Sequence, residues 1–207
     1  MPRVSLKQAS LALARMDPVM ARLVKEAGVC RLPPRGSRTH FGALVRSIVF
    51  QQLQGKAASA IHARLVETLG GDVTPEAVLR RRSTTLRRAG LSGSKEASIR
   101  DLAAKVRDGA VELDRLPRLR DDRIIEQLVA VRGIGPWTAQ MFLMFQLRRL
   151  DVWPALDYGV RRGYAIAYDL DPMPTEREIG PLGDRFRPYR SVAAWYCWRA
   201  TEITDPG

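Results

Sequence analysis

The spacing of apolar residues constrains the fold of this 207-residue chain more than any other feature of its sequence. Apolar side chains recur at three- and four-residue intervals in two early segments, through Phe41, Leu44, Val45, Ile48 and Val49 and then through Ile61, Leu65 and Leu69. This spacing places them on one face of an α-helix, whereas a half-buried strand alternates at every second residue. Short runs that could form strands occur at 150–153 and 192–197, and the second follows a helix start signal at 188–191. The sequence therefore predicts an all-α fold.

Helix start signals support this prediction along the chain. Residues typical of N-caps and first turns precede several apolar stretches, at Thr74-Pro75, Ser94, 121–122 and 175–178. Side-chain oxygens at such positions accept hydrogen bonds from the first free amides of a helix. Together with the apolar spacing, they predict about ten short helices.

Two breaks divide the chain, one at 33–36 with two prolines and a glycine and one at 170–174 with two prolines. We expect two lobes, one covering 45–115 and the other combining 1–40 with 116–207, with a cleft between them. Domains commonly have about 100–200 residues, so the chain is long enough for this arrangement. The family resemblance described below implies that the two lobes form a single catalytic domain with its active site in this cleft.

The chain is strongly basic, with a formal net charge of +12 and an isoelectric point near 10.6. Arginine accounts for 29 of its 34 basic residues. A polyanion such as nucleic acid is the partner that this charge favours, because each neutralised phosphate releases a counterion. A GC-rich coding sequence would produce the same arginine bias, so charge alone does not identify the function.

Composition also argues against several classes of protein. No apolar run approaches the roughly 20 residues that span a bilayer, and residues 1–5 lack the layout of a secretory signal. We therefore expect a soluble cytoplasmic protein with no membrane partner, associated with the nucleoid in a bacterium. Cys30, Cys197 and two histidines provide no metal-ligand spacing, and a cluster that needs four cysteines is excluded. We expect no metal site built from side chains.

Residues 128–139 combine a helix end, a Gly-x-Gly turn and a new helix with Pro136 in its first turn. Gly133 and Gly135 let the backbone approach a phosphate, and free amides at the next helix N-terminus attract the anion. An ordinary interhelical turn can contain the same glycines. The neighbouring segments must therefore decide between the two interpretations.

This segment resembles the helix-hairpin-helix motif of the DNA glycosylase superfamily, and 151–162 resembles the loop and helix that follow it there. Segments 48–53, 90–95 and 188–196 also resemble the alkylated-base branch, the 3-methyladenine DNA glycosylase II type. The resemblance covers nearly the whole chain. It implies a two-lobed helix-hairpin-helix glycosylase fold without the N-terminal β-rich domain of larger members. It also implies duplex DNA with damaged bases as the partner, and we expect a monomer.

By this resemblance Asp157 is the catalytic residue. A carboxylate about 4 Å from the developing oxocarbenium-like sugar contributes roughly 4 kcal/mol at an effective dielectric constant of 20. Taken without the resemblance, Asp157 is an N-cap of a helix over 158–168. The two roles are compatible with each other.

The same comparison bears on the reaction type. In bifunctional relatives, a lysine two residues after the second hairpin glycine forms a Schiff base, and this chain has Trp137 there. No lysine lies between Lys105 and residue 207. We therefore expect a monofunctional enzyme that flips and excises alkylated bases such as 3-methyladenine and 7-methylguanine. The main alternative is a non-catalytic, lesion-recognising DNA-binding protein, against which Asp157 argues.

The resemblance also assigns residues around the flipped base. Aromatic faces suit a cationic purine, and the resemblance places three residues in the base pocket, Trp137, Met141 and Trp198. Core packing would explain either tryptophan equally simply. One residue of a short segment would fill the gap that the flipped nucleotide leaves, and the candidates are Gln52, Leu53 and Gln54. A polar helix terminus is the alternative explanation for these glutamines.

Phosphate contacts are expected from two regions. Five hairpin residues are candidates for binding DNA, namely Arg132, Gly133, Ile134, Gly135 and Thr138. Arg161 and Arg162 lie one turn beyond the predicted catalytic residue and are candidates for phosphate contacts, whereas 80–82 and 87–88 have the pattern of solvated faces. No cofactor is required, but the resemblance implies a possible Na⁺ or K⁺ ion on hairpin carbonyls near 130–135.

Overall fold

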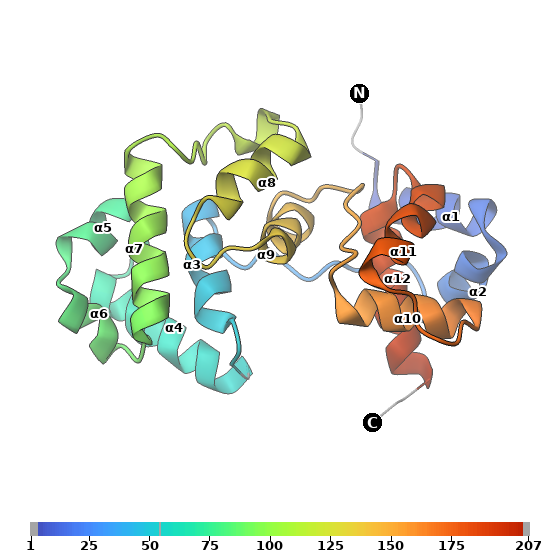
Figure 1. Cartoon of the computed structure of the whole chain (residues 1–207), viewed down its shortest axis with the longest axis horizontal. Helices are drawn as coiled ribbons and strands as arrows, with labels where there is room; N and C mark the ends of the chain where they lie inside the picture. Colours follow the sequence, from blue (N-terminus) through green and yellow to red (C-terminus); the bar gives the residue numbers. More distant parts are fainter. Residues whose placement is uncertain (1–3, 54, 205–207) are drawn as a thin grey trace. The chain divides into compact units, whose positions relative to one another are not determined.

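The computed structural model describes residues 4–53 and 55–204, and the regular secondary structure in these ranges is helical, with no strand. The predicted all-α fold is therefore confirmed. The chain divides into two compact units. Unit 1 combines the residues up to Pro34 with those from Arg148 onward, and unit 2 covers Arg35–Leu147. Figure 1 shows the helices of each unit.

Unit 1 contains helices from both ends of the chain. They are α1 (Leu6–Met16), α2 (Pro18–Ala27), α10 (Tyr158–Tyr168), α11 (Glu176–Leu182), the short helix η3 (Gly183–Phe186) and α12 (Arg190–Thr204). Helix α12 contacts α10, α2 and α1 and so forms the centre of this unit. Four aromatic residues form a second part of the core, with ring centroids 4.3–6.4 Å apart, namely Trp153, Tyr164, Tyr168 and Phe186.

Unit 2 contains the remaining helices. They are α3 (His40–Phe50), α4 (Gly55–Leu69), α5 (Pro75–Arg80), α6 (Ser83–Arg88), α7 (Gly93–Arg107), η1 (Leu116–Arg118), α8 (Asp121–Val129), α9 (Pro136–Met141) and the π-helical turn η2 (Phe142–Gln146). Helix α3 is the most apolar of the early helices and packs against both α4 and α7. Helices α8 and α9 pack against each other and flank the predicted hairpin.

Most helix starts are where the caps predict them. The Thr74 hydroxyl accepts a hydrogen bond from the Ala77 amide, and Thr175 forms a capping box with Glu178. The predicted start at Ser94 is two residues late, because Ser92 caps α7 by accepting from the Lys95 amide. The two possible strand segments are not strands: 150–153 has no regular structure, and 192–197 lies within α12.

The predicted lobe boundary differs from the division in the structure. Residues 116–147 were expected with the chain termini, yet they belong to unit 2 together with 35–115. The cause is a set of contacts between distant residues, in which the hairpin is held by side chains of α7 and of the turn after α3. Local sequence patterns do not record such contacts. No helix in the described ranges is long and apolar enough to cross a membrane.

Candidate active site

Asp157 is the N-cap of α10, and its side chain is half-buried. Its Oδ1 accepts two hydrogen bonds of 2.9 Å, from the backbone amide of Val160 and from the indole Nε1 of Trp198. The first donor is local, and the second comes from α12. The carboxylate thus lies at the positive end of the α10 dipole, in an orientation set by two donors.

The Trp198 indole has a contact that the sequence did not predict. We expected this residue in the base pocket, and the structure shows its ring nitrogen donating to the Asp157 carboxylate. The ring is half-buried and lies against Gly159, where an added Cβ would be 2.9 Å from the Trp198 Cδ1. Glycine at this position therefore makes room for the indole beside the carboxylate.

Helices α10 and α12 approach each other most closely at Gly163. A Cβ built at this position would lie 1.8 Å from the carbonyl oxygen of Cys197. Burial raises the pKa of the Cys197 thiol, and the negative charge of Asp157 raises it further. The thiol is therefore neutral at physiological pH and has the role of a buried apolar group rather than a nucleophile.

Asp151, six residues before Asp157, forms ion pairs with two arginines. Its carboxylate accepts from Arg190 Nε at 2.8 Å and from Arg187 Nη1 at 3.1 Å. The Arg190 guanidinium also donates to the backbone carbonyl of Asp151 at 2.8 Å. These bonds join the loop before α10 to the start of α12, so Asp151 is occupied by ion pairs.

The two predicted phosphate ligands of α10 differ in exposure. Arg162 is exposed, whereas Arg161 is half-buried with its guanidinium carbon 6.0 Å from the Tyr158 ring centroid. The Nε of Arg161 is buried and has no hydrogen-bond partner. The Arg161 amide donates to the Asp157 carbonyl at 3.1 Å, which confirms that it lies one helical turn beyond this residue.

The two glycines of the hairpin in unit 2 differ in conformation, since Gly135 is extended and only Gly133 lies in the left-handed region. Gly133 has a φ of +76°, a conformation that glycine adopts without strain. A Cβ there would also lie 2.5 Å from the Ser98 hydroxyl. Ile134 and Thr138 are buried, whereas Arg132 and Gly135 are exposed. The exposed backbone of this turn leads directly into the N-terminus of α9.

Side chains from elsewhere in unit 2 hold the hairpin, and sequence reasoning did not assign them this role. The Asp101 carboxylate accepts from the Arg132 amide at 2.7 Å. The Gln51 side-chain amide donates to the Gly133 carbonyl at 2.9 Å. Their sequence separation left no local signal that could have identified them.

Lys95 holds the turn after α3, which carries the residues predicted to fill the gap left by the flipped nucleotide. We call this candidate group the wedge. Its ammonium group donates to the carbonyl oxygens of Val49 and Gln51, both at 2.7 Å, and so caps the C-terminus of α3. Burial lowers the pKa of this amine. Gln51 therefore connects the Lys95 cap to the hairpin, and the wedge turn and hairpin are parts of one hydrogen-bonded assembly.

A pocket of about 500 Å³ lies beside this assembly. Its lining includes five predicted site residues, namely Gln52, Gly133, Trp137, Thr138 and Met141. The Trp137 side chain is 43% exposed, which argues against simple core packing. The structure therefore brings the predicted wedge, hairpin and two pocket residues of unit 2 to one concave surface.

The wedge candidates differ in what the structure shows of them. Gln52 is exposed and has a φ of +54°, and the exposed Leu53 side chain has 39% of its area accessible. Gln54 lies outside the described residues. Leu53 is therefore an exposed large apolar group immediately after the turn that Lys95 and Gln51 hold.

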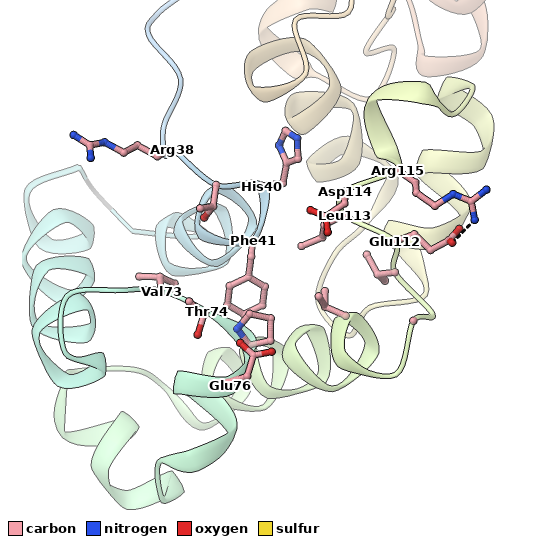
Figure 2. A pocket seen from close by; sticks show the side chains of 15 residues that line it. Arg38, His40, Phe41, Val73, Thr74, Glu76, Glu112, Leu113, Asp114 and Arg115 are labelled. Carbon is pink, nitrogen blue, oxygen red and sulfur yellow. Dashed lines mark hydrogen bonds and ion pairs between the residues drawn. The ribbon is translucent and has the colours of Figure 1, made fainter.

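A larger pocket, of about 690 Å³, contains none of the predicted site residues (Figure 2). Helix α3 contributes His40 and Phe41 to it, and the loop before η1 contributes Glu112 and Arg115, which form an ion pair. Burial and the nearby Arg35 lower the pKa of His40, so this imidazole is neutral at physiological pH. We assign no chemistry to this pocket.

A metal ion could be bound by side chains or by the backbone carbonyls of the hairpin. The described His, Cys, Asp and Glu residues form no group of three or more that could hold a metal ion. Of the hairpin carbonyls, Val131 accepts from the Ile134 amide and Gly133 accepts from Gln51. A carbonyl oxygen has a second lone pair, so these bonds are compatible with a monovalent ion.

Comparison with protein families matches residues 45–184 to the HhH-GPD superfamily, described as base excision DNA repair proteins. DNA-3-methyladenine glycosylase 1 of Schizosaccharomyces pombe is 34% identical over 206 residues, which cover 97% of this chain and 90% of the relative.

Two solved structures resemble the chain over nearly its full length. The S. pombe 3-methyladenine DNA glycosylase Mag1, solved in complex with abasic DNA, matches with a TM-score of 0.82 and 33% identity, covering 95% of this chain and 97% of that chain. DNA-3-methyladenine glycosidase from Bacillus halodurans matches with a TM-score of 0.88 and 34% identity, covering 99% of this chain and 95% of that chain.

Proposed function

Because the chain belongs to the HhH-GPD superfamily of base excision DNA repair proteins, we propose that it excises alkylated bases of the 3-methyladenine and 7-methylguanine type from duplex DNA. The observation that carries this proposal is the Asp157 carboxylate, half-exposed at the start of α10 and oriented by Trp198. Excision leaves an abasic site, and we propose that the enzyme acts as a monomer.

The proposed chemistry needs one well-placed carboxylate. Alkylation at N3 or N7 gives a purine a positive charge and makes it a good leaving group. The Asp157 carboxylate stabilises the positive charge that develops on the sugar as the glycosidic bond breaks, and it orients the attacking water. The Trp198 hydrogen bond holds the carboxylate oxygen in place, so little reorganisation is needed during the reaction.

Each unit supplies proposed DNA contacts. In unit 2, the exposed backbone of the hairpin and the N-terminus of α9 suit a phosphate group. In unit 1, the exposed Arg162 is a separate candidate for a phosphate contact. We propose Leu53 as the residue that fills the gap in the base stack. Its side chain is exposed and apolar, so it can pack between the bases, whereas the polar side chain of Gln52 would lose its hydration there. Trp137 and Met141 would contact the flipped base.

We further propose that the enzyme lacks lyase activity. Trp137 occupies the position of the Schiff-base lysine, and the Lys95 amine of unit 2 is engaged by two backbone carbonyls. On duplexes with a single alkylated base, we expect base release without strand cleavage until alkali is added. Borohydride should trap no covalent adduct.

The measurement is base release by chromatography, run in parallel with strand cleavage on denaturing gels. Release of alkylated bases from duplex DNA would support the glycosylase. Binding to these duplexes without release of any base would instead support the non-catalytic, lesion-recognising alternative. A trapped adduct would contradict the monofunctional assignment.

DNA binding by the hairpin is expected to weaken steeply with salt. The logarithm of the binding constant should fall linearly with the logarithm of the salt concentration, by about 0.9 for each phosphate contact. Fluorescence anisotropy with a labelled duplex measures this slope, and a flat dependence would exclude a phosphate-binding surface.

We also propose that the hairpin carbonyls near 130–135 hold a monovalent ion. Replacing K⁺ with a bulky organic cation at constant ionic strength should then weaken DNA binding.

A further inference from the structure

The proposed active site uses none of the arginines in 77–95. This segment contains six basic residues and no acidic residue. One of the six is Lys95, which caps α3. The other five form what we call the arginine ridge, and all of them are exposed, namely Arg80, Arg81, Arg82, Arg87 and Arg88.

Ion pairing separates the ridge from neighbouring arginines of unit 2. In that unit Arg115, Arg120 and Arg123 are also exposed, and each forms an ion pair with an acidic residue up to three positions away. Within the described ranges, no Asp or Glu side chain forms an ion pair with any ridge arginine. In the part of the chain that the structure describes, no ion pair therefore offsets the mutual repulsion of the ridge, and a bound polyanion would reduce it.

The backbone beneath the ridge is well anchored. Val78 and Leu86 are fully buried, and they fix α5 and α6 to the core of unit 2. The Arg100 guanidinium donates to the Arg81 carbonyl, and Arg64 Nε donates to the Ala89 carbonyl at 3.0 Å. The five arginines therefore extend from an anchored backbone. Ligand binding does not have to order this backbone, so the entropic cost of binding is lower.

The ridge does not belong to the hairpin surface. Helices α5 and α6 pack against α7, whereas the hairpin joins α8 and α9. In Figure 1, α7 lies between the α5–α6 pair and the α8–α9 pair, and Asp101 of α7 holds the hairpin. The ridge and the hairpin therefore lie on different sides of α7, and a short duplex that contacts only the hairpin leaves the ridge accessible.

We propose that the arginine ridge binds the phosphate backbone of a second DNA segment while the hairpin holds the first. This proposal rests on the proposed function, which makes duplex DNA the polyanion that the protein meets. Guanidinium groups form paired hydrogen bonds with phosphate oxygens, and the exposed Ser83 and Thr84 hydroxyls can add neutral contacts. The consequence is direct transfer of the enzyme from one DNA segment to another during the search for damage.

The test compares two triple variants of the whole chain. The ridge variant is Arg80→Gln, Arg81→Gln, Arg82→Gln, and the control is Arg115→Gln, Arg120→Gln, Arg123→Gln. Each variant removes three exposed positive charges, but only the control arginines have acidic partners in the described structure. Stopped-flow fluorescence measures release of a labelled duplex as the concentration of unlabelled competitor duplex increases.

Release from the wild type and from the control should accelerate with competitor concentration, because the competitor binds before the first duplex leaves. For the ridge variant, the increase in release rate per unit of competitor concentration should be at least about threefold smaller. The salt slope of this competitor-dependent step should fall by about 2.7, which corresponds to three lost phosphate contacts. Single-turnover excision on a short duplex should change less than about twofold, since the hairpin and Asp157 are intact.

Three results would overturn the proposal. Equal competitor dependence in the ridge variant and the control would show that the ridge is only a solvated face. Loss of short-duplex binding in the ridge variant alone would place the ridge within the primary DNA site. Acceleration by an acidic polypeptide but not by duplex DNA would assign the ridge to a protein partner. These three results can be distinguished from a failure of the proposed function, because in that case the wild type would release no base in the excision measurement.

Discussion

Replacing Asp157 with asparagine is expected to lower the rate of base excision by at least about 100-fold, which corresponds to roughly 2.7 kcal/mol of transition-state stabilisation. Asparagine retains an oxygen that can accept from Val160 and Trp198, so the cap and the indole contact should survive. The lost property is the negative charge opposite the developing cation. Affinity for duplex DNA should be unchanged or higher, because a negative charge has been removed.

The matched control is Asp169→Asn at the other end of α10. Asp169 is an exposed C-cap with a φ of +54°, a conformation that asparagine also tolerates. Single-turnover excision from a duplex with one 7-methylguanine, a base of the proposed substrate class, provides the measurement. Full activity of Asp157→Asn on this substrate, with normal circular dichroism, would remove the catalytic assignment. Equal losses in both variants would point to a general electrostatic effect.

Replacing Gly163 with alanine is expected to cause the largest loss of stability. The new methyl group would lie 1.8 Å from the Cys197 carbonyl oxygen, and no side chain can move to relieve this contact. Helices α10 and α12 would have to separate, at a cost of at least about 3 kcal/mol. For a chain of this size, thermal denaturation should show a decrease in melting temperature of roughly 6–12 °C.

Gly93→Ala at the start of α7 provides the control, because an added Cβ there would meet no atom within 4 Å. Alanine at this open helical position should leave stability unchanged or raise it by up to about 1 kcal/mol. A large decrease in melting temperature for Gly163→Ala, with no decrease for Gly93→Ala, would support the close helix contact. A melting temperature for Gly163→Ala that matches the wild type would show that the two helices are not packed as described.

Much of the local structure followed from the sequence. Apolar spacing identified α3 and α4, and capping residues located the starts of α5 and α11. The turn between α8 and α9 also lies where the hairpin was predicted. These features depend on residues within one or two helical turns, so their signals lie together in the chain. The two-residue error at Ser94 shows the limit, because both Ser92 and Ser94 are competent N-caps.

The features that depend on distant residues could not be predicted in this way. The sequence by itself determined that Asp157 begins a helix and that a hairpin with Trp137 precedes it. Only the tertiary structure showed that Trp198 orients the carboxylate, that Gln51 holds the hairpin, and that residues 116–147 belong to unit 2. The physical reason is that helix caps and apolar faces arise from neighbouring residues, whereas these hydrogen bonds join residues that are 41 and 82 positions apart in the chain. Packing alone brings such residues together.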